Sequence, residues 1–209
     1  GKRTQHGLRV QQAQWKSAEF EALRRLGEVG VRVPQTRGVI DGVLLMELIR
    51  DADGAPASRL NEVELSAEQA LQWHAFMINQ IVRMLCAGLI HGDLSEFNVL
   101  AGPHGPVIID LPQAVDAAGN NNAFRMLARD VENMRATFGR AAPELLDTEF
   151  AIEMWDRYEA GTLEPDSVLS GHHSRSFVTA DVEAVLDEIA QARLDAETEE
   201  LAREEAIYD

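Results

Sequence analysis

The sequence predicts an α+β fold with two lobes, a small mixed lobe followed by a larger and mostly helical one. Two apolar runs around a short turn near residue 41 predict a β-hairpin early in the chain. Later segments repeat apolar residues at steps of three and four, the period of helices that bury one face. With 209 residues, the chain is long enough for one ordinary domain or two small lobes.

Residues 1–50 predict a helix and then the hairpin. From Trp15, apolar side chains fit one helical face that Gly27 or Gly30 is suited to end. The pair Asp41-Gly42 lies between two apolar runs and tolerates the positive φ of a two-residue turn. Residues 51–64 are polar and predict a connection between the lobes.

Residues 65–180 predict the larger lobe. Ser66, followed by Gln69, is typical of a helix start, and Gly88 of its end. The apolar positions assigned to this helix are Leu71, Ala75, Ile78, Val82 and Leu85. A second hairpin is expected from residues 98–100 and 107–109, around a turn at 102–105.

The remaining apolar positions predict further helices. One stripe consists of Leu127, Val131, Met134 and Phe138, and another of Leu146, Phe150, Met154 and Tyr158. Residues 181–209 predict an acidic helix or tail whose charges face solvent.

Composition narrows the classes of partner. The net charge of −16 opposes binding to phosphate backbones, so nucleic acid is a poor default partner. No run of 18 apolar residues predicts a membrane span, and the single cysteine cannot form an internal disulfide. We therefore expect a cytoplasmic protein.

The stretch His91-Gly92-Asp93-Leu94-Ser95-Glu96-Phe97-Asn98 carries the strongest chemical signal, together with Asp110 at the end of an apolar strand. Phosphoryl transfer from ATP needs a carboxylate to orient the attacking hydroxyl and oxygen ligands to hold Mg²⁺. Asp93 and Asn98 are five positions apart, the spacing of the base and the metal-binding Asn in kinase catalytic loops. A buried Asp110 would be costly unless a cation compensated its charge.

These residues resemble the RIO-type atypical protein kinases over nearly the whole chain, most closely a RIO1-like branch with a bacterial composition. The segments 91–98 and 109–116 are similar to the two signatures of that family, and Leu45–Ile49 to its hinge. Trp15 with Glu19 resembles the helix of its first lobe. The resemblance implies a two-lobed kinase-like fold and an ATP- and Mg²⁺-dependent transfer to serine.

The resemblance also implies residue roles. Asp93 would be the catalytic Asp, Asn98 and Asp110 the Mg²⁺ ligands, and Asp110 is further discussed in the family as a phosphate acceptor during ATP hydrolysis. For the nucleotide, Glu47 and Ile49 would offer backbone groups to the adenine, and Met46 would line the back of the pocket. Glu19 would pair with a phosphate-binding lysine. Family members are associated with ribosome maturation, which implies a ribosome-associated partner; the protein substrate is unknown.

The sequence departs from the kinase pattern in its first residues. Lys2 and Lys16 are the only lysines, and neither lies in an apolar strand. No glycine-rich loop precedes Trp15, so we expect a small lobe that lacks its first strands. Without a lysine beside Glu19, transfer should be weak or absent, although the rest of the ATP site could form.

Two other functions stay open. Aminoglycoside-type phosphotransferases also use His-Gly-Asp-Leu, but they differ after the leucine, where this chain has Ser95-Glu96-Phe97. A non-catalytic scaffold that binds nucleotide as a conformational ligand is the third class. At single residues, His91 either acts as a base or orders its loop, and Ser95 and Glu96 either touch substrate or shape the turn. Ala142-Pro143-Glu144 either imitates a kinase element or starts a helix.

Overall fold

A computed structural model describes residues 18–172, 188, 189 and 191. The chain divides into two compact units, Gly1–His172 and His173–Asp209. In the second unit, residues 188, 189 and 191 are helical. Trp15, both lysines, and most of the helix predicted after residue 181 lie outside the described residues. The first unit combines helices with short strands, which confirms the predicted α+β class.

The first unit begins with a helix and the predicted hairpin. Residues 18–28 are helical, and Leu23 and Leu26 are buried on that helix. Strand β1 (Thr36–Ile40) pairs antiparallel with β2 (Val43–Met46). Asp41 and Gly42 both have positive φ, 50° and 75°, so the predicted two-residue turn is confirmed.

The polar connection is fastened to the larger part of the unit at two places. A 3₁₀ helix, η1 (Leu60–Glu62), buries Leu60. Just before it, Arg59 forms a bridge with Leu100 on a strand of the larger part. This contact holds the end of the connection beside the segment 91–98 that the sequence singles out.

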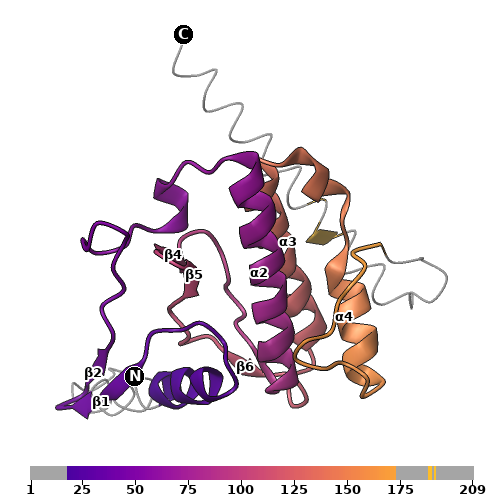
Figure 1. The fold of residues 1–209 in the computed structure, drawn as a ribbon. Coiled ribbons are helices and arrows are strands. Elements are labelled where there is room, and N and C mark those ends of the chain that lie inside the picture. The colour runs from indigo at the N-terminus through magenta and orange to yellow at the C-terminus, as the bar shows by residue number, and fades with distance from the viewer. Residues whose placement is uncertain (1–17, 173–187, 190, 192–209) are drawn as a thin grey trace, which may run out of the picture. The chain divides into compact units, whose positions relative to one another are not determined.

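Helix α2 (Ala67–Cys86) is the longest helix of the described residues and runs beside the later helix α3 (Figure 1). Ser66 Oγ accepts a hydrogen bond from Gln69 N at 3.2 Å, and Gly88 has a φ of 74°, which confirms the predicted start and end. The predicted buried face was wrong in its first half, because Leu71 and Ala75 are exposed. The first turns instead bury Ala70, His74 and Met77, a face rotated by one residue.

Four short strands follow α2 and surround the signature segments. β3 (Leu89–Ile90) pairs with β6 (Val115–Asp116), and β4 (Val99–Gly102) pairs with β5 (Gly105–Ile108). The β4–β5 hairpin was predicted, whereas the two-residue pair β3–β6 was not. Residues 91–98 therefore join β3 to β4, and residues 109–114 join β5 to β6.

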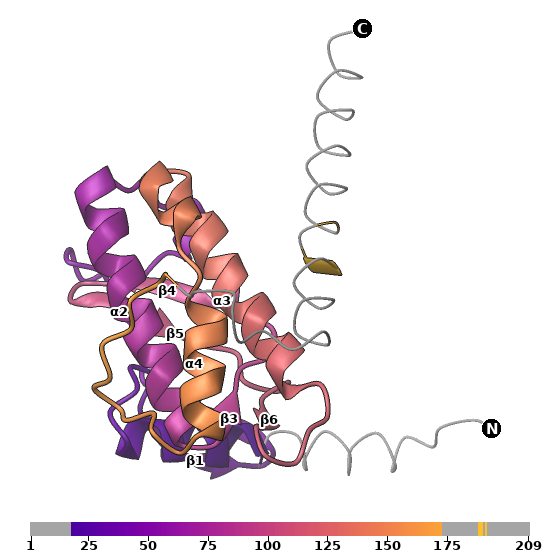
Figure 2. The same cartoon turned by 90° about the vertical axis from the view of Figure 1, so that its right-hand side faces the viewer.

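Helices complete the unit. α3 (Ala123–Gly139) buries all four residues of its predicted stripe. A 3₁₀ helix, η2 (Pro143–Asp147), precedes α4 (Phe150–Glu159), which packs against α2 and α3 (Figure 2). The second predicted stripe was wrong as one helix, because Leu146 belongs to η2 and folds back onto Gly139, where a Cβ would collide with it. No helix among the described residues is long and apolar enough to cross a bilayer.

Candidate active site

The two signature segments are joined by backbone hydrogen bonds. Ile109 N donates to Asn98 O at 3.0 Å, which extends the β4–β5 pairing by one step. The His91 ring contacts the other side of the same residue, with Nε2 3.0 Å from Ile109 O. Asp110, the next residue, is thereby held close in the fold to Asn98.

Asn98 is oriented by a hydrogen bond to the backbone of Asp93. Its side chain is buried, 7% exposed, and its Nδ2 donates to Asp93 O at 2.8 Å. Because the amide nitrogen is used in this way, Oδ1 is the atom that Asn98 would offer to a cation. The Asp93 side chain is exposed at the opposite end of this tight turn. An amide oxygen and a carboxylate, such as those of Asn98 and Asp110, are donors of the kind that suits Mg²⁺.

Asp110 adopts a backbone conformation that is rare for a residue with a side chain. Its φ is 64°, in the left-handed region. Its side chain is exposed, so the burial considered for Asp110 from the sequence was wrong, and its charge needs no cation to compensate burial. The following Leu111 is buried, which fixes the chain immediately after this strained residue. Backbone strain of this kind persists where the surroundings enforce it and is concentrated at functional sites.

His91 orders the loop through both of its ring nitrogens. Nε2 lies against Ile109 O, and Nδ1 accepts from Asp93 N at 3.3 Å. The two contacts together require a neutral ring with its proton on Nε2. Burial lowers the pKa of His91, which favours that neutral form. Of the two roles considered for His91, the structure supports the ordering one.

Asp130 on α3 holds the turn from beneath, and sequence reasoning missed it. Its Oδ2 and Oδ1 accept from Gly92 N at 2.8 Å and Leu94 N at 2.9 Å, on either side of Asp93. Asp130 is 1% exposed, and burial raises its pKa to about 7, against the effect of the two N–H donors. The available signal was a lone carboxylate within the apolar stripe of α3, one position before Val131.

Other α3 side chains complete this support. Arg129 donates to Gly92 O, and Asn133 Nδ2 donates to Leu94 O at 2.8 Å. Glu96 turns back toward the same helix, where it accepts from Thr137 Oγ1 at 3.1 Å and from Arg140 at 3.3 Å. Glu96 therefore shapes the turn, the second of the two roles considered for it. The loop is anchored chiefly by polar side chains of one helix.

The predicted hinge, Leu45–Ile49, begins with the last two residues of β2. Glu47 N donates to Gln35 O at 2.8 Å, while the Glu47 carboxylate binds Arg32 at 3.1 Å, an interaction that lowers the pKa of Glu47. Ile49 is buried, and its carbonyl accepts from Ala57 N at 3.0 Å. The groups these two residues would offer to a base are thus the Glu47 carbonyl and the Ile49 amide. Met46 ends β2 with a 39% exposed side chain.

The remaining sequence signals are placed as follows. Glu19 lies half-buried on the helix at 18–28, and both lysines of the chain, Lys2 and Lys16, lie outside the described residues. Pro143 is the first residue of η2, which supports the helix-start interpretation of Ala142-Pro143-Glu144. Within the described residues, no group of three or more His, Cys, Asp or Glu side chains could hold a metal ion.

Comparison with known proteins identifies the family. A family model described as the RIO domain matches residues 1–151. The chain belongs to the RIO domain family. The Haloferax volcanii protein named RIO-type serine/threonine-protein kinase Rio1 is 39% identical over 126 residues, which cover 60% of this chain and 42% of that protein. Human serine/threonine-protein kinase RIO1 is 34% identical over 127 residues, 60% of this chain and 22% of that protein.

The RIO chain thus spans less than half the length of these curated relatives. A similarly named Rio1 from Methanocaldococcus jannaschii is 33% identical over 130 residues, again 60% of this chain and 42% of that protein. Among solved structures, the crystal structure of a kinase domain matches with a TM-score of 0.41 and 16% identity, over 62% of this chain and 52% of that one. The predicted resemblance to RIO-type kinases is confirmed by the family match.

Proposed function

We propose that this RIO chain binds ATP with Mg²⁺ and forms the catalytic centre of a serine-directed phosphotransferase. One observation carries the proposal: Asp93, Asn98 and Asp110 belong to two segments that hydrogen bonds join directly, from Ile109 N to Asn98 O and between the His91 ring and Ile109 O. In a chance match to a motif, there is no reason for the matching segments to lie side by side in the fold. Relatives named serine/threonine-protein kinases support the same reaction class.

Each residue has a distinct role in this proposal. Asp93, exposed on a turn that α3 fixes from both sides, would orient a serine hydroxyl or a water and accept its proton. Asn98 Oδ1 and the Asp110 carboxylate would hold Mg²⁺, which supplies charge neutralisation at the phosphates. The Glu47 carbonyl and the Ile49 amide would bind the adenine, with Met46 beside it. Glu19 would pair with a phosphate-binding lysine, a role for which the sequence marks neither Lys2 nor Lys16.

The metal assignment is tested by nucleotide binding. Asp110→Asn should abolish the increase in affinity that Mg²⁺ gives for a non-hydrolysable ATP analogue, because a weakly caged Mg²⁺ depends on each carboxylate ligand. Calorimetric titrations with and without Mg²⁺ measure this difference. Asp53→Asn, on an exposed turn, is the matched control and should behave as the parent. Unchanged Mg²⁺ dependence in Asp110→Asn would reject the assignment.

The catalytic assignment is tested by separating turnover from binding. Asp93→Asn should lower turnover of ATP by about 100-fold or more, the scale of lost general-base catalysis, and change analogue affinity less than about threefold. Release of labelled phosphate and the same calorimetric titration measure the two quantities. A parallel loss of both would indicate a folding defect, which circular dichroism would reveal.

The acceptor is tested with labelled ATP. The parent chain is incubated with casein, with kanamycin, or with neither. Labelled casein supports the protein kinase, whereas labelled kanamycin would replace it with the aminoglycoside-type enzyme. Free phosphate alone would indicate an ATPase, and binding without any product a nucleotide-dependent scaffold. A ribosome-associated partner stays a prediction from the family resemblance.

A further inference from the structure

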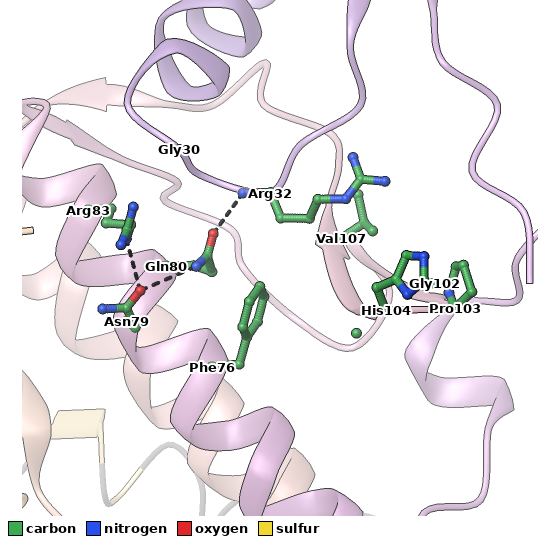
Figure 3. Close-up of a pocket in the computed structure, with 11 residues that line it drawn as sticks. Gly30, Arg32, Phe76, Asn79, Gln80, Arg83, Gly102, Pro103, His104 and Val107 are labelled. Atoms are coloured by element: carbon green, nitrogen blue, oxygen red, sulfur yellow. Dashed lines mark hydrogen bonds between the residues drawn. The ribbon is translucent and has the colours of Figure 1, made fainter. Parts of the chain in front are cut away.

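We propose that a cavity behind the hinge, remote in role from the phosphoryl-transfer residues, binds a small aromatic carboxylate. The cavity has a volume of about 370 Å³ and lies between α2, the turn after the first helix and the β4–β5 turn (Figure 3). Small-molecule sites fall in the range of roughly 300–1,000 Å³. No role in the proposed phosphoryl transfer uses this cavity.

The cavity is basic in an otherwise acidic chain. Its described lining contains Arg32, Arg83 and His104, and no Asp or Glu among those lining residues. The chain as a whole carries a net charge of −16. The carboxylates that pair with these arginines, Glu47 with Arg32 and Asp166 with Arg83, are not part of the lining, so an anion in the cavity binds by replacing one of them. The lining therefore favours a ligand with a negative charge.

Arg83 is the cation best placed to bind that charge. Arg32 is fully engaged with Glu47, at 3.1 and 3.2 Å, and with Val33 O. Arg83 Nη2 instead pairs with Asp166, whose side chain is 84% exposed. Ion pairs exposed to this degree contribute little, so a ligand carboxylate can replace Asp166 at small cost. A planar carboxylate also matches the fork of a guanidinium.

The other lining groups suit an aromatic ring with polar edges. Phe76 and Gln80 project from α2, and His104 lies across the hollow on the β4–β5 turn (Figure 3). Gln80 is 3% exposed, and its Nε2 is 3.5 Å from Asn79 Oδ1, longer than an ordinary hydrogen bond. A ligand oxygen would satisfy this buried donor better. The Phe76 ring offers the apolar surface on which an aromatic ligand can pack.

Two of the residues that line the cavity contact the predicted hinge. Arg32 binds the Glu47 carboxylate, and Gly102 lies against Ile49, whose Cγ2 would be 3.6 Å from a Cβ at that position. Glu47 and Ile49 are the two residues proposed to bind the adenine. A ligand in the cavity would therefore alter nucleotide affinity. This coupling, unlike the binding itself, rests on the proposed function.

Binding is tested with indole-3-acetate and its neutral counterpart indole-3-acetamide, titrated into the full chain and followed by NMR. We expect the acid to bind saturably and at least about tenfold more tightly than the amide, the scale of one charge-assisted hydrogen bond. Equal affinity for the two compounds, or no saturable binding of the acid, would overturn the proposal.

Two variants assign the charge to its residue. Arg83→Gln should weaken the acid about tenfold and leave the amide unchanged, whereas Asp166→Asn should tighten the acid by removing its competitor. Arg24→Gln, an exposed arginine paired with Glu21 and Glu28 on the first helix, is the control. If Arg83→Gln does not fold, Asp166→Asn decides, and absence of tightening rejects the site.

The coupling is measured separately. The affinity of the Mg²⁺-bound ATP analogue should change at least twofold when indole-3-acetate saturates the cavity. An unchanged nucleotide affinity, with acid binding intact, would reject the coupling alone. Failure of the analogue to bind in any condition would reject the proposed function and leave the carboxylate site standing.

Discussion

The loop at residues 91–98 and the hairpin β1–β2 are both short, and the sequence predicts both. They differ in the contacts that stabilise them. In the loop, Asp130, Asn133 and Arg129 contact the backbone on both sides of Asp93. The hairpin instead depends on its own ladder, and its apolar side chains face solvent, with Ile40 60% and Val43 53% exposed.

This difference predicts that the loop has one well-defined conformation and that the hairpin can adjust. A loop whose N–H groups are bonded to buried side chains has one low-energy arrangement, because each broken bond leaves an unsatisfied polar group. A two-stranded hairpin with exposed faces has little burial to fix it and is marginal by itself. The residues proposed for catalysis lie on the first kind of element, while those proposed for the adenine follow the second.

The largest expected effect comes from removing the main anchor of the loop. Asp130→Ala leaves the N–H groups of Gly92 and Leu94 without acceptors, at about 1–3 kcal/mol for each buried donor, so we expect a loss of about 2–6 kcal/mol of unfolding free energy. Urea denaturation measures the change. Asp147→Ala, at an exposed carboxylate, should change stability by less than about 0.5 kcal/mol.

A small effect of Asp130→Ala would contradict the idea that α3 anchors the loop, because the loop would then hold its shape without this contact. A large loss of stability with nucleotide binding retained would separate two roles of the anchor. Anchoring would in that case serve stability, and the position of Asp93 would be fixed by the remaining contacts of His91 and Asn133.

The sequence predicted what is periodic or local. The stripe of α3, the cap at Ser66 and the turn at Asp41-Gly42 follow from spacing and turn chemistry, and all three are present. The exposure of the hairpin could not be predicted, because two apolar runs around a turn indicate a pair of strands but not what covers them. The helix predicted through Leu146 failed because Gly139 admits a close approach that spacing does not reveal.

The site was predicted in part for a related reason. Asp93, Asn98 and Asp110 could be proposed because their residue types and spacing match the chemistry, and their roles stay predictions. Asp130 was missed because its partners are backbone groups 36 and 38 positions away, which no side-chain pattern reports. Buried polar residues on an apolar stripe are the general clue to such anchors, since burial without partners would be too costly.

The next largest effect is expected on the pH dependence of stability, through His74 in the packing between α2 and α3. It is 2% exposed beside Phe138 and Phe150, its Nε2 has no hydrogen-bond partner among the described residues, and burial lowers its pKa to about 4. The unfolded chain, with an ordinary pKa near 6.5, takes up this proton first as pH falls. Its contribution is therefore full above pH 6.5 and is lost toward pH 4, by about 3 kcal/mol.

Asp130 acts in the opposite direction, because its pKa is raised from 3.8 to about 7 and its contribution falls as pH rises through that interval. The informative quantity is thus the difference between the parent and His74→Leu in urea denaturation at a series of pH values. The variant should lose less stability than the parent between pH 6.5 and 4. If the unfolding free energies of the two proteins change in parallel with pH, His74 does not contribute to the pH dependence of stability.

The smallest effect is expected on the hairpin and is measured best as a matched pair. Ile40 is 60% exposed on β1, whereas Ile90 is 2% exposed on β3, directly before the loop. Ile40→Thr should change the unfolding free energy by less than about 0.5 kcal/mol, because most of its surface already meets water. Ile90→Thr should cost about 2–4 kcal/mol, since it removes buried hydrocarbon and buries a hydroxyl. Similar losses of unfolding free energy at both positions would contradict the exposure of the hairpin. They would mean that Ile40 is buried in solution, as Ile90 is.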